Sequence, residues 1–539
     1  MEQEVKVEEV KEEVKTSKKG GKKGWIILLV VLGFTLIGGA VYLLLTNNKD
    51  NNKKEVKTET EVKKSAYYMT GNSLQKFDLA FLKLENEKKN MIYSPLSIKY
   101  ALEMLAEGSN GTTKSQIDSI IGEYVAKKYT NSKNMSFANA MFIRDTFKDK
   151  VLPTYTENIA NKYNAEVIYD SFSSAKTIND WVSNKTLKLL NNLIDDDFAR
   201  QLDFALVNAL AIDMSWNYKI QAAATNGDAE SKYYNVSYSH EKYDAYVPLI
   251  MEGNDYASTK FDGGKMNAKT VEIGASINNY DIVKELGEAN IRKTVGAEYK
   301  KWLAGDGKDF EQAEKDVDKF LDGYIKELNS NYKKVDDSTD FYLYDDTEVK
   351  TFAKDLKTYN GTTLQYVGIM PKNVSLDSYI RDLEVDKVNN IITNLKDIKS
   401  ENFKEGVVTK VIGNIPLFKF DYELKLEDDL KKLGVTDLFE IDKVDLSNLI
   451  YDKKKNIVVK QKANIDFSNE GIKAAAATIG GGLGNASAGF EYLYDVPVEI
   501  IDLTFNKPYL FLIRDKASGE VWFSGTVYEP TKGVEKSNQ

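Results

Sequence analysis

The stretch Asn90–Ile117, NMIYSPLSIKYALEMLAEGSNGTTKSQI, contains a helix whose two ends can be placed from the sequence. Ser94 can cap the helix by accepting a hydrogen bond from a backbone N–H of the first turn, and Pro95 suits the first helical position. Gly108 is a candidate C-cap, where a left-handed backbone favours glycine. We therefore expect a helix bounded by Ser94 and Gly108.

The segments around this helix predict helices first and strands towards the end of the chain. Residues 73–87, SLQKFDLAFLKLENE, place apolar side chains at helical spacing. Residues 203–216, DFALVNALAIDMSW, and 509–515, YLFLIRD, are continuous apolar runs of strand length, which is typical of strands buried on both faces. This order of elements predicts an α+β domain.

The N-terminal part of the chain predicts a membrane anchor. Residues 25–45, WIILLVVLGFTLIGGAVYLLL, form an uncharged run that is long enough for a helix to cross a hydrocarbon core of about 30 Å. No small-residue cleavage site follows it, which disfavours a signal peptide. Lysines are more numerous before the run than after it, so we expect the N-terminus inside. Residues 1–24 then form a disordered cytoplasmic tail, 46–65 a solvated stalk, and 66–539 an extracellular domain.

The composition excludes several classes of function. The net charge of −9 disfavours binding to nucleic acid. The absence of cysteine excludes disulfides, thiolate catalysis and cysteine-ligated zinc. The single histidine, His240, is the only possible base for a Ser-His-Asp site and lies in a polar segment, which disfavours an enzyme. We expect no cofactor and no metal site. The richness in Lys, Asn, Tyr, Ile and Asp suggests an AT-rich bacterial genome and a Gram-positive source.

The blocks of sequence around the helix resemble the serpin family, in family order, over most of the chain after the stalk. The resemblance implies an α+β serpin fold with about nine helices, three β-sheets and an exposed reactive loop. An insertion of about 80–100 residues within 220–345 has no counterpart in the family pattern, and it contains amphipathic helical stretches. The matching blocks are NMIYSPLSIKYALEMLAEGSNGTTKSQI (90–117), SFANAMFI (136–143), FSSAKTINDWVSNKTLKLLNNLI (172–194), LVNALAIDMSW (206–216), YVGIMPKN (366–373), IPLFKFDYELKLEDDLKKLGVTDLF (415–439) and FNKPYLFLIRDKASGEVWFSGTVYEP (505–530).

The resemblance implies a cell-surface suicide inhibitor of serine-type, or sometimes cysteine-type, endopeptidases rather than an enzyme. In this family a protease cleaves the reactive loop, and the loop then inserts into the central sheet and traps the acyl-enzyme. The alternative is a non-inhibitory serpin that acts as a protease substrate or as a binding protein.

The segment NEGIKAAAATI (469–479) matches the hinge of the reactive loop by this resemblance. Glycine gives the entry point freedom to bend, and because strand side chains alternate, every second hinge residue would face the sheet core. None of these inward residues is charged, and alanine is small enough for a tightly packed core. Taken alone, the alanines also fit a helix followed by a glycine linker. The hinge comprises Gly471, Ile472, Lys473, Ala474, Ala475, Ala476, Ala477 and Thr478, of which Ile472, Ala474, Ala476 and Thr478 face inward.

Two counts place the scissile bond differently. Family spacing from the hinge glycine places it between Asn485 and Ala486, whereas counting back from FNKP gives Pro497, so the loop is longer than usual. We favour the hinge-side count, because the inserted length fixes how far the protease travels. Small residues here would suit an elastase-like or subtilisin-like protease, and the extra segment 490–500 is either an exosite or a longer tether. Small shifts in register leave Leu483, Gly484 and Ser487 as alternatives.

The resemblance also implies a region where the central sheet opens. Gln461 stands where the family usually has a histidine, which latches the sheet through nearby serine and asparagine side chains. Glutamine can both donate and accept hydrogen bonds, so the latch can persist. The residues of this region are Ser94, Ser97, Asn208, Gln461 and Trp216.

Overall fold

The computed structural model describes the globular part of the chain. No helix within these residues is long and apolar enough to cross a membrane. The apolar run 25–45 and the tail before it lie outside them, as does nearly all of the stalk. The described residues are 64–217, 235–238, 243–245, 261–262, 265–266, 270–305, 310–331, 341–451, 457–467, 471–472, 490 and 492–530.

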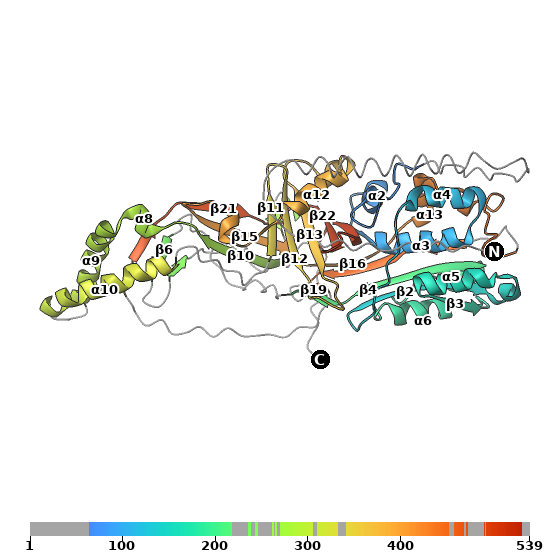
Figure 1. The fold of residues 1–539 in the computed structure, drawn as a ribbon, viewed down its shortest axis with the longest axis horizontal. Helices are drawn as coiled ribbons and strands as arrows, with labels where there is room; N and C mark the ends of the chain where they lie inside the picture. The colour runs from blue at the N-terminus through green and yellow to red at the C-terminus, as the bar shows by residue number, and fades with distance from the viewer. Residues whose placement is uncertain are drawn as a thin grey trace, which may run out of the picture. The chain divides into compact units, whose positions relative to one another are not determined.

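The largest sheet of the described residues has seven strands (Figure 1). Its strand β22 is the run YLFLIRD, and the predicted strand is therefore confirmed over its whole length. The sheet takes the order β1-β23-β22-β13-β12-β11-β14. The strands are β1 (Met91–Tyr93), β23 (Val521–Val527), β22 (Tyr509–Asp515), β13 (Leu364–Pro371), β12 (Val349–Asp355), β11 (Phe341–Asp345) and β14 (Lys396–Asp397).

Two four-stranded ladders form the ends of a second, central sheet. One ladder has the order β17-β4-β2-β3 and the other β16-β18-β19-β5. A single residue, Asp213, separates β4 from β5, and Gln461 alone separates β17 from β18, so two long strands run through both ladders. The strands are β17 (Ile457–Lys460), β4 (Phe204–Ile212), β2 (Met135–Arg144), β3 (Ala165–Asp170), β16 (Phe418–Glu423), β18 (Lys462–Phe467), β19 (Gly471–Ile472) and β5 (Met214–Ser215).

The third main sheet has three strands, β10 (Thr270–Asn278), β15 (Val408–Pro416) and β21 (Val498–Asp502). Smaller ladders join β20 (Tyr492–Asp495), β6 (Asn235–Tyr238) and β7 (Tyr243–Ala245), and β8 (Phe261–Asp262) with β9 (Lys265–Met266). Three main sheets agree with the prediction from the family resemblance.

Nine helices of seven or more residues occur in the described part of the chain, as the resemblance predicts. Shorter helical segments are α7 (Asp196–Arg200), α8 (Ile282–Leu286), α11 (Leu376–Arg381), η1 (Asp145–Lys150), η2 (Ser400–Asn402) and η3 (Asp437–Phe439). The nine are α2 (Lys76–Leu84), α3 (Pro95–Gly108), α4 (Gly111–Ile121), α5 (Pro153–Tyr163), α6 (Lys176–Lys185), α9 (Glu288–Gly305), α10 (Phe310–Asn331), α12 (Val385–Thr393) and α13 (Leu426–Leu433).

Helix α3 begins as the sequence predicts, but it ends differently. The Ser94 hydroxyl accepts a hydrogen bond from the Ser97 N–H at 3.1 Å, which confirms the N-cap. Gly108 is the last helical residue rather than a left-handed cap, and Ser109 is the C-cap. A Cβ at Gly108 would lie 3.0 Å from Tyr155 and 3.1 Å from Leu449. Glycine is therefore required here by close packing and not by backbone conformation.

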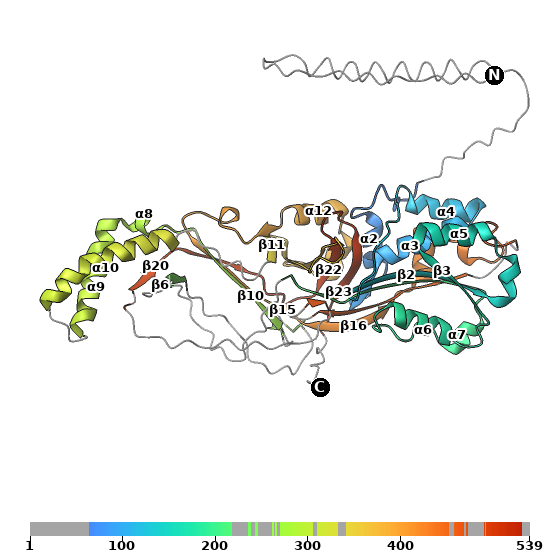
Figure 2. The same ribbon diagram turned by 60° about the horizontal axis from the view of Figure 1, so that its bottom comes forward.

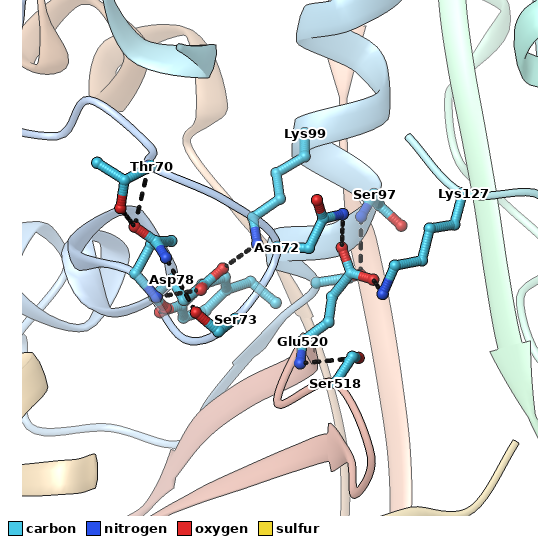
Figure 3. Close-up of polar contacts among 12 residues, drawn as sticks. Thr70, Asn72, Ser73, Asp78, Ser97, Lys99, Lys127, Ser518 and Glu520 are labelled. Carbon is cyan, nitrogen blue, oxygen red and sulfur yellow. Dashed lines mark hydrogen bonds and ion pairs between the residues drawn. The ribbon is translucent and has the colours of Figure 1, made fainter. Parts of the chain in front are cut away.

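A buried ion pair seats helix α3 against helix α2 (Figure 3). The Lys99 ammonium lies 2.7 Å from the Asp78 carboxylate, and both side chains are completely buried. Asp78 also accepts a hydrogen bond from the Gln75 N–H at 2.7 Å. Burial raises the pKa of Asp78, and Lys99 opposes this shift. Because removing one partner would leave a buried charge uncompensated, the pair fixes how α3 and its cap residue Ser94 are oriented.

A second buried carboxylate lies beside this ion pair. Glu520 accepts hydrogen bonds from the Tyr129 hydroxyl at 2.5 Å and from the Asn72 side chain at 3.3 Å, and its carboxylate lies 3.5 Å from the Lys127 ammonium. Figure 3 shows Asn72 and Lys127 converging on it. Glu520 therefore links the β22–β23 turn to the segment before α2 and to the segment after α4.

Helices α8, α9 and α10 lie between β10 and β11 in the sequence and have a hydrophobic core of their own. In both Figures 1 and 2, α9 and α10 lie side by side. A Cβ at Gly296 would lie 3.2 Å from Leu321, so a small residue permits this close packing. The amphipathic stretches predicted within 220–345 are therefore helices. We call residues 279–331 the helical insertion.

Two carboxyl groups lie close together where α2 ends and α13 packs. Glu85, the C-cap residue of α2, accepts a hydrogen bond from the Lys425 N–H at 2.9 Å and another from the Tyr422 hydroxyl. Asp429 on α13 is buried, and its carboxylate lies 3.0 Å from the partly exposed Lys432 ammonium. Burial raises the pKa of Asp429 to about 6; Lys432 lowers it, and the neighbouring Glu85 raises it further.

This pair predicts that Asp429→Asn stabilises the protein above pH 6. The unfolded carboxyl titrates near 3.8, so the contribution of Asp429 to the stability of the wild type is most favourable below pH 4 and is lost as pH rises through about 6. The amide side chain of asparagine removes the buried charge, and it loses only the free energy of the ion pair with the exposed Lys432, which is small. We expect a gain on the order of 1–2 kcal/mol at pH 7.5 that disappears at pH 4, measured by urea denaturation. Asp428→Asn, on the exposed face of α13, is the control; an equal effect of both variants would contradict the assignment.

Candidate sheet-opening site and loop hinge

The two long strands of the central sheet pair with each other over only part of their length. Ile457–Lys460 of β17 run parallel to Phe204–Val207 of β4. Beyond this point the described residues of β18 pair with β16 and β19, while those of β4 pair with β2. The sheet is therefore open between β4 and β18.

The first hinge residues occupy the far end of this opening. Gly471 pairs with Ser215 and Ile472 pairs with Met214, and Ile472 also pairs with Phe467 on the other side. Strand β19 is therefore antiparallel to both neighbours and lies between them. The other predicted hinge residues (Lys473, Ala474, Ala475, Ala476, Ala477 and Thr478) lie outside the described residues, as do Leu483, Gly484, Asn485, Ala486 and Ser487.

A cavity lies where the two long strands separate. Four of the five predicted sheet-opening residues line it, namely Ser94, Ser97, Asn208 and Gln461. The structure therefore brings together side chains from α3, from β4 and from the junction of β17 with β18. The remaining lining residues are Val182, Thr186, Leu190, Leu193, Ala209, Leu210, Lys460, Lys462, Ala463 and Phe523.

Gln461 forms a two-point contact with the cap of helix α3. Its side-chain oxygen accepts from the Ser94 N–H at 3.1 Å, and its side-chain nitrogen donates to the Ser94 carbonyl at 2.8 Å. The glutamine therefore binds the backbone of Ser94, whereas the family resemblance suggested serine and asparagine side chains. The Ser94 hydroxyl is occupied by Ser97, and the Asn208 amide donates to Asn139. We call the two bonds between Gln461 and Ser94 the latch.

Trp216 lies apart from the other predicted residues of this region. It follows β5, is fully buried, and contacts Phe467 and Tyr366 with ring centroids 5.5 and 6.1 Å away. It is not among the residues that line the cavity. Because Phe467 pairs with Ile472, Trp216 packs against the end of the opening that β19 occupies.

Asn139 is a site residue that the sequence analysis missed. It is buried on β2, accepts the hydrogen bond from Asn208, and donates to the Tyr163 carbonyl at 2.9 Å. The sequence does contain a signal that could have identified it, because Asn139 is a polar residue inside the apolar run SFANAMFI. Thr186, which lines the cavity next to α6, was also missed and carries no comparable signal.

The comparisons with known proteins agree with this geometry. A family model described as "Serpin (serine protease inhibitor)" matches residues 74–263 and 310–530. The chain therefore belongs to the serpin family. The match omits residues 264–309, which include all of β10 together with α8 and α9.

The relatives are distant but extend over most of the chain. Leukocyte elastase inhibitor of Homo sapiens is 24% identical, with 83% of this chain and 94% of the relative covered. Neuroserpin of Mus musculus is 22% identical, with 82% and 87% covered. Among solved structures, the native state of the thermophilic serpin tengpin has a TM-score of 0.52 at 20% identity, covering 89% of this chain and 96% of that one. At this identity the likeness shows the fold alone.

Family membership decides the question of catalysis. Serpins are protease inhibitors and not enzymes, so the chain has no Ser-His-Asp catalytic role. His240, the only candidate base, lies outside the described residues. Within the described residues, no group of three or more His, Cys, Asp or Glu side chains could hold a metal ion.

The latch predicts that Gln461→Ala destabilises the native state by about 1–3 kcal/mol. The substitution leaves the buried Ser94 N–H without a partner and removes one of the two hydrogen bonds to the Ser94 carbonyl, which keeps the bond from the Ile98 N–H at 3.2 Å. The measurement is the midpoint of urea denaturation, with loss of tertiary structure followed by tryptophan fluorescence.

Lys462→Ala is the matched control on the adjacent residue. Lys462 forms a partly exposed ion pair with Asp421 at 3.0 Å, and such pairs contribute about 0–1 kcal/mol. If the two variants were equally stable, the latch would contribute no more than a surface contact.

Proposed function

We propose that the protein is a suicide inhibitor of serine-type endopeptidases, whose cleaved loop inserts between β4 and β18. The observation that carries this proposal is strand β19, because it places the start of the loop between the strands that insertion must separate. Membership of the serpin family, whose model is described as a serine protease inhibitor, supports the same function.

The pairing of β19 fixes where each following residue would lie if the strand continued in register. Ala474 would lie between Ile212 and Ile465, and Ala476 would lie next between Leu210 and Ala463. These four neighbours are buried in the main hydrophobic core, and residues in one row of a sheet share a face. The alternation proposed from the sequence therefore places the small hinge residues on the core side.

The same register brings Thr478 level with Asn208 and Gln461, beside the latch. The existing opening thus accommodates the hinge as far as Thr478. Further insertion requires the four residue pairs between β17 and β4 to separate. The latch and this short parallel ladder are the barrier that insertion must overcome.

Insertion gains backbone hydrogen bonds on both sides of the new strand. Residues 473–478 would complete roughly a dozen of them, worth on the order of 10 kcal/mol at about 1 kcal/mol each. A marginally stable protease is held together by a similar free energy. The inserted strand can therefore supply enough free energy to distort a protease that remains attached to it.

The location and target belong to the same proposal. The uncharged run 25–45 supports a single-pass anchor with the inhibitor outside a bacterial cell. The small residues at 484, 486 and 487 support an elastase-like or subtilisin-like target, cleaving between Asn485 and Ala486. The other count, Pro497, falls on a carbonyl that accepts a hydrogen bond from the Val408 N–H at 2.9 Å, which would obstruct a protease there.

The inhibitor function predicts an SDS-stable complex with at least one protease from a panel of elastase-like and subtilisin-like enzymes. Cleavage in the loop should also raise the melting temperature, because the inserted strand adds hydrogen bonds and burial. The measurements are gel electrophoresis, mass spectrometry of the released fragment and differential scanning calorimetry.

Cleavage without a complex would favour the alternative, a non-inhibitory serpin that acts as a substrate or as a binding protein. An unchanged melting temperature would mean that the loop does not insert.

The register predicts opposite outcomes for two neighbouring arginine substitutions. Ala476→Arg would bring a charge into the row of Leu210 and Ala463, so it should raise the stoichiometry of inhibition about tenfold or more. Ala475→Arg lies on the opposite face, in the row of the half-buried Asn464 and the buried but small Ala211, and should retain inhibition. The ratio of inhibitor to protease at complete inhibition distinguishes them. Equal effects of the two variants would refute the register.

A further inference from the structure

Phe490 lies in the core of the helical insertion, although it belongs to the segment after the reactive loop. It is 3% exposed. Its ring centroid lies 5.1 Å from Tyr299, 5.5 Å from Phe320 and 6.0 Å from Trp302. The interplanar angles of 78°, 88° and 64° make these edge-to-face contacts, which favour aromatic pairs beyond the area that they bury.

The rings around Phe490 are held in place by one another. Tyr299 on α9 stacks on Phe320 of α10, with centroids 3.7 Å apart, and also on Trp302. The seat of Phe490 is therefore built from both helices of the insertion. We call Tyr299, Trp302 and Phe320 the aromatic seat.

The chain that follows Phe490 is fixed to the body of the protein. Strand β20 pairs with β6, the Pro497 carbonyl accepts from the Val408 N–H, and β21 pairs with β15. At the other end, Ile472 is held in the central sheet. Both ends of the segment 473–489 are thus anchored, one in a sheet and the other in the helical insertion.

We propose that the helical insertion positions the reactive loop, with Phe490 as its distal anchor. The seat restricts the protease-accessible part of the loop to residues before 490. Because one end of this part is fixed, it loses less conformational entropy on binding a protease than a loop without the anchor would. It also retains the C-terminal fragment on the body after cleavage. The proposal rests on the inhibitor function proposed above, and it gives the extra segment 490–500 the role of a tether rather than an exosite.

Anchoring acts on the encounter with a protease and not on the fate of the acyl-enzyme. A loop that is ordered before binding loses less conformational entropy on binding, so the anchor should raise the association rate. Insertion proceeds from the hinge side, where Phe490 has no part. An anchor therefore changes the association rate constant, whereas a change in the inserted strand alters the stoichiometry of inhibition.

The experiment compares Phe490→Ala with wild type in the full-length chain. Limited digestion with subtilisin, followed by mass spectrometry, should cut wild type within 473–489 and the variant also within 490–497. With a target protease, the variant should associate about tenfold more slowly at an unchanged stoichiometry. Phe490→Leu, which keeps apolar volume, should restore part of both properties.

Leu328→Ala is the matched control, because Leu328 is buried in the same core but is not one of the rings of the seat. It should leave the cleavage pattern as in wild type. If Phe490→Ala adds no cuts after 489, or if Leu328→Ala adds the same cuts, Phe490 is not a specific anchor. If wild type inhibits no protease, the proposed function fails, whereas the digestion pattern still tests the anchor.

Discussion

The central sheet is unfinished, and the rest of the structure depends on this constraint. Its two long strands pair over four residues, Ile457–Lys460 with Phe204–Val207, and then separate by the width of one strand. Backbone groups that face such an opening favour a further strand, because buried polar groups require partners. The chain carries that strand immediately after β18, and its first two residues are already in place. The cavity, the latch and β19 thus all lie along the same opening between the two long strands.

The opening is stable only because the elements around it are held firmly. Lys99 and Asp78 fix α3 on α2, and α3 presents the Ser94 backbone to Gln461. A buried ion pair is weak evidence for net stability, but its geometry is demanding, so it suits a role in orientation. The latch itself consists of two hydrogen bonds, each worth about 1 kcal/mol. In the proposed mechanism, this rigid support and these weak closing bonds would let the sheet open while the surrounding core stays intact.

The sequence predicts the elements better than it predicts the contacts between them. Cap chemistry located the start of α3, and apolar runs located β4 and β22, because these signals are local. Gly108 was misinterpreted as a cap because its real constraint, the approach of Tyr155 and Leu449, comes from distant segments. The resemblance identified Gln461, but its backbone partner at Ser94 depends on strand register. Nothing local links Phe490 to Tyr299 and Phe320, since these residues are brought together only by the fold.

The two ends of the reactive segment differ in the chemistry that each task requires. In the proposed mechanism the hinge side moves into a packed sheet, and its sequence carries alanines, which add little volume and lose no side-chain entropy on burial. The distal side must stay in place, and a phenylalanine among three aromatic rings resists withdrawal because it buries a large apolar surface. In the proposed mechanism, cleavage between them would separate a strand that enters the sheet from one that remains on the helical insertion. In the proposed mechanism, the helical insertion, of which α8 and α9 lie outside the family match and α10 inside it, acts on the reactive loop without contacting the central sheet.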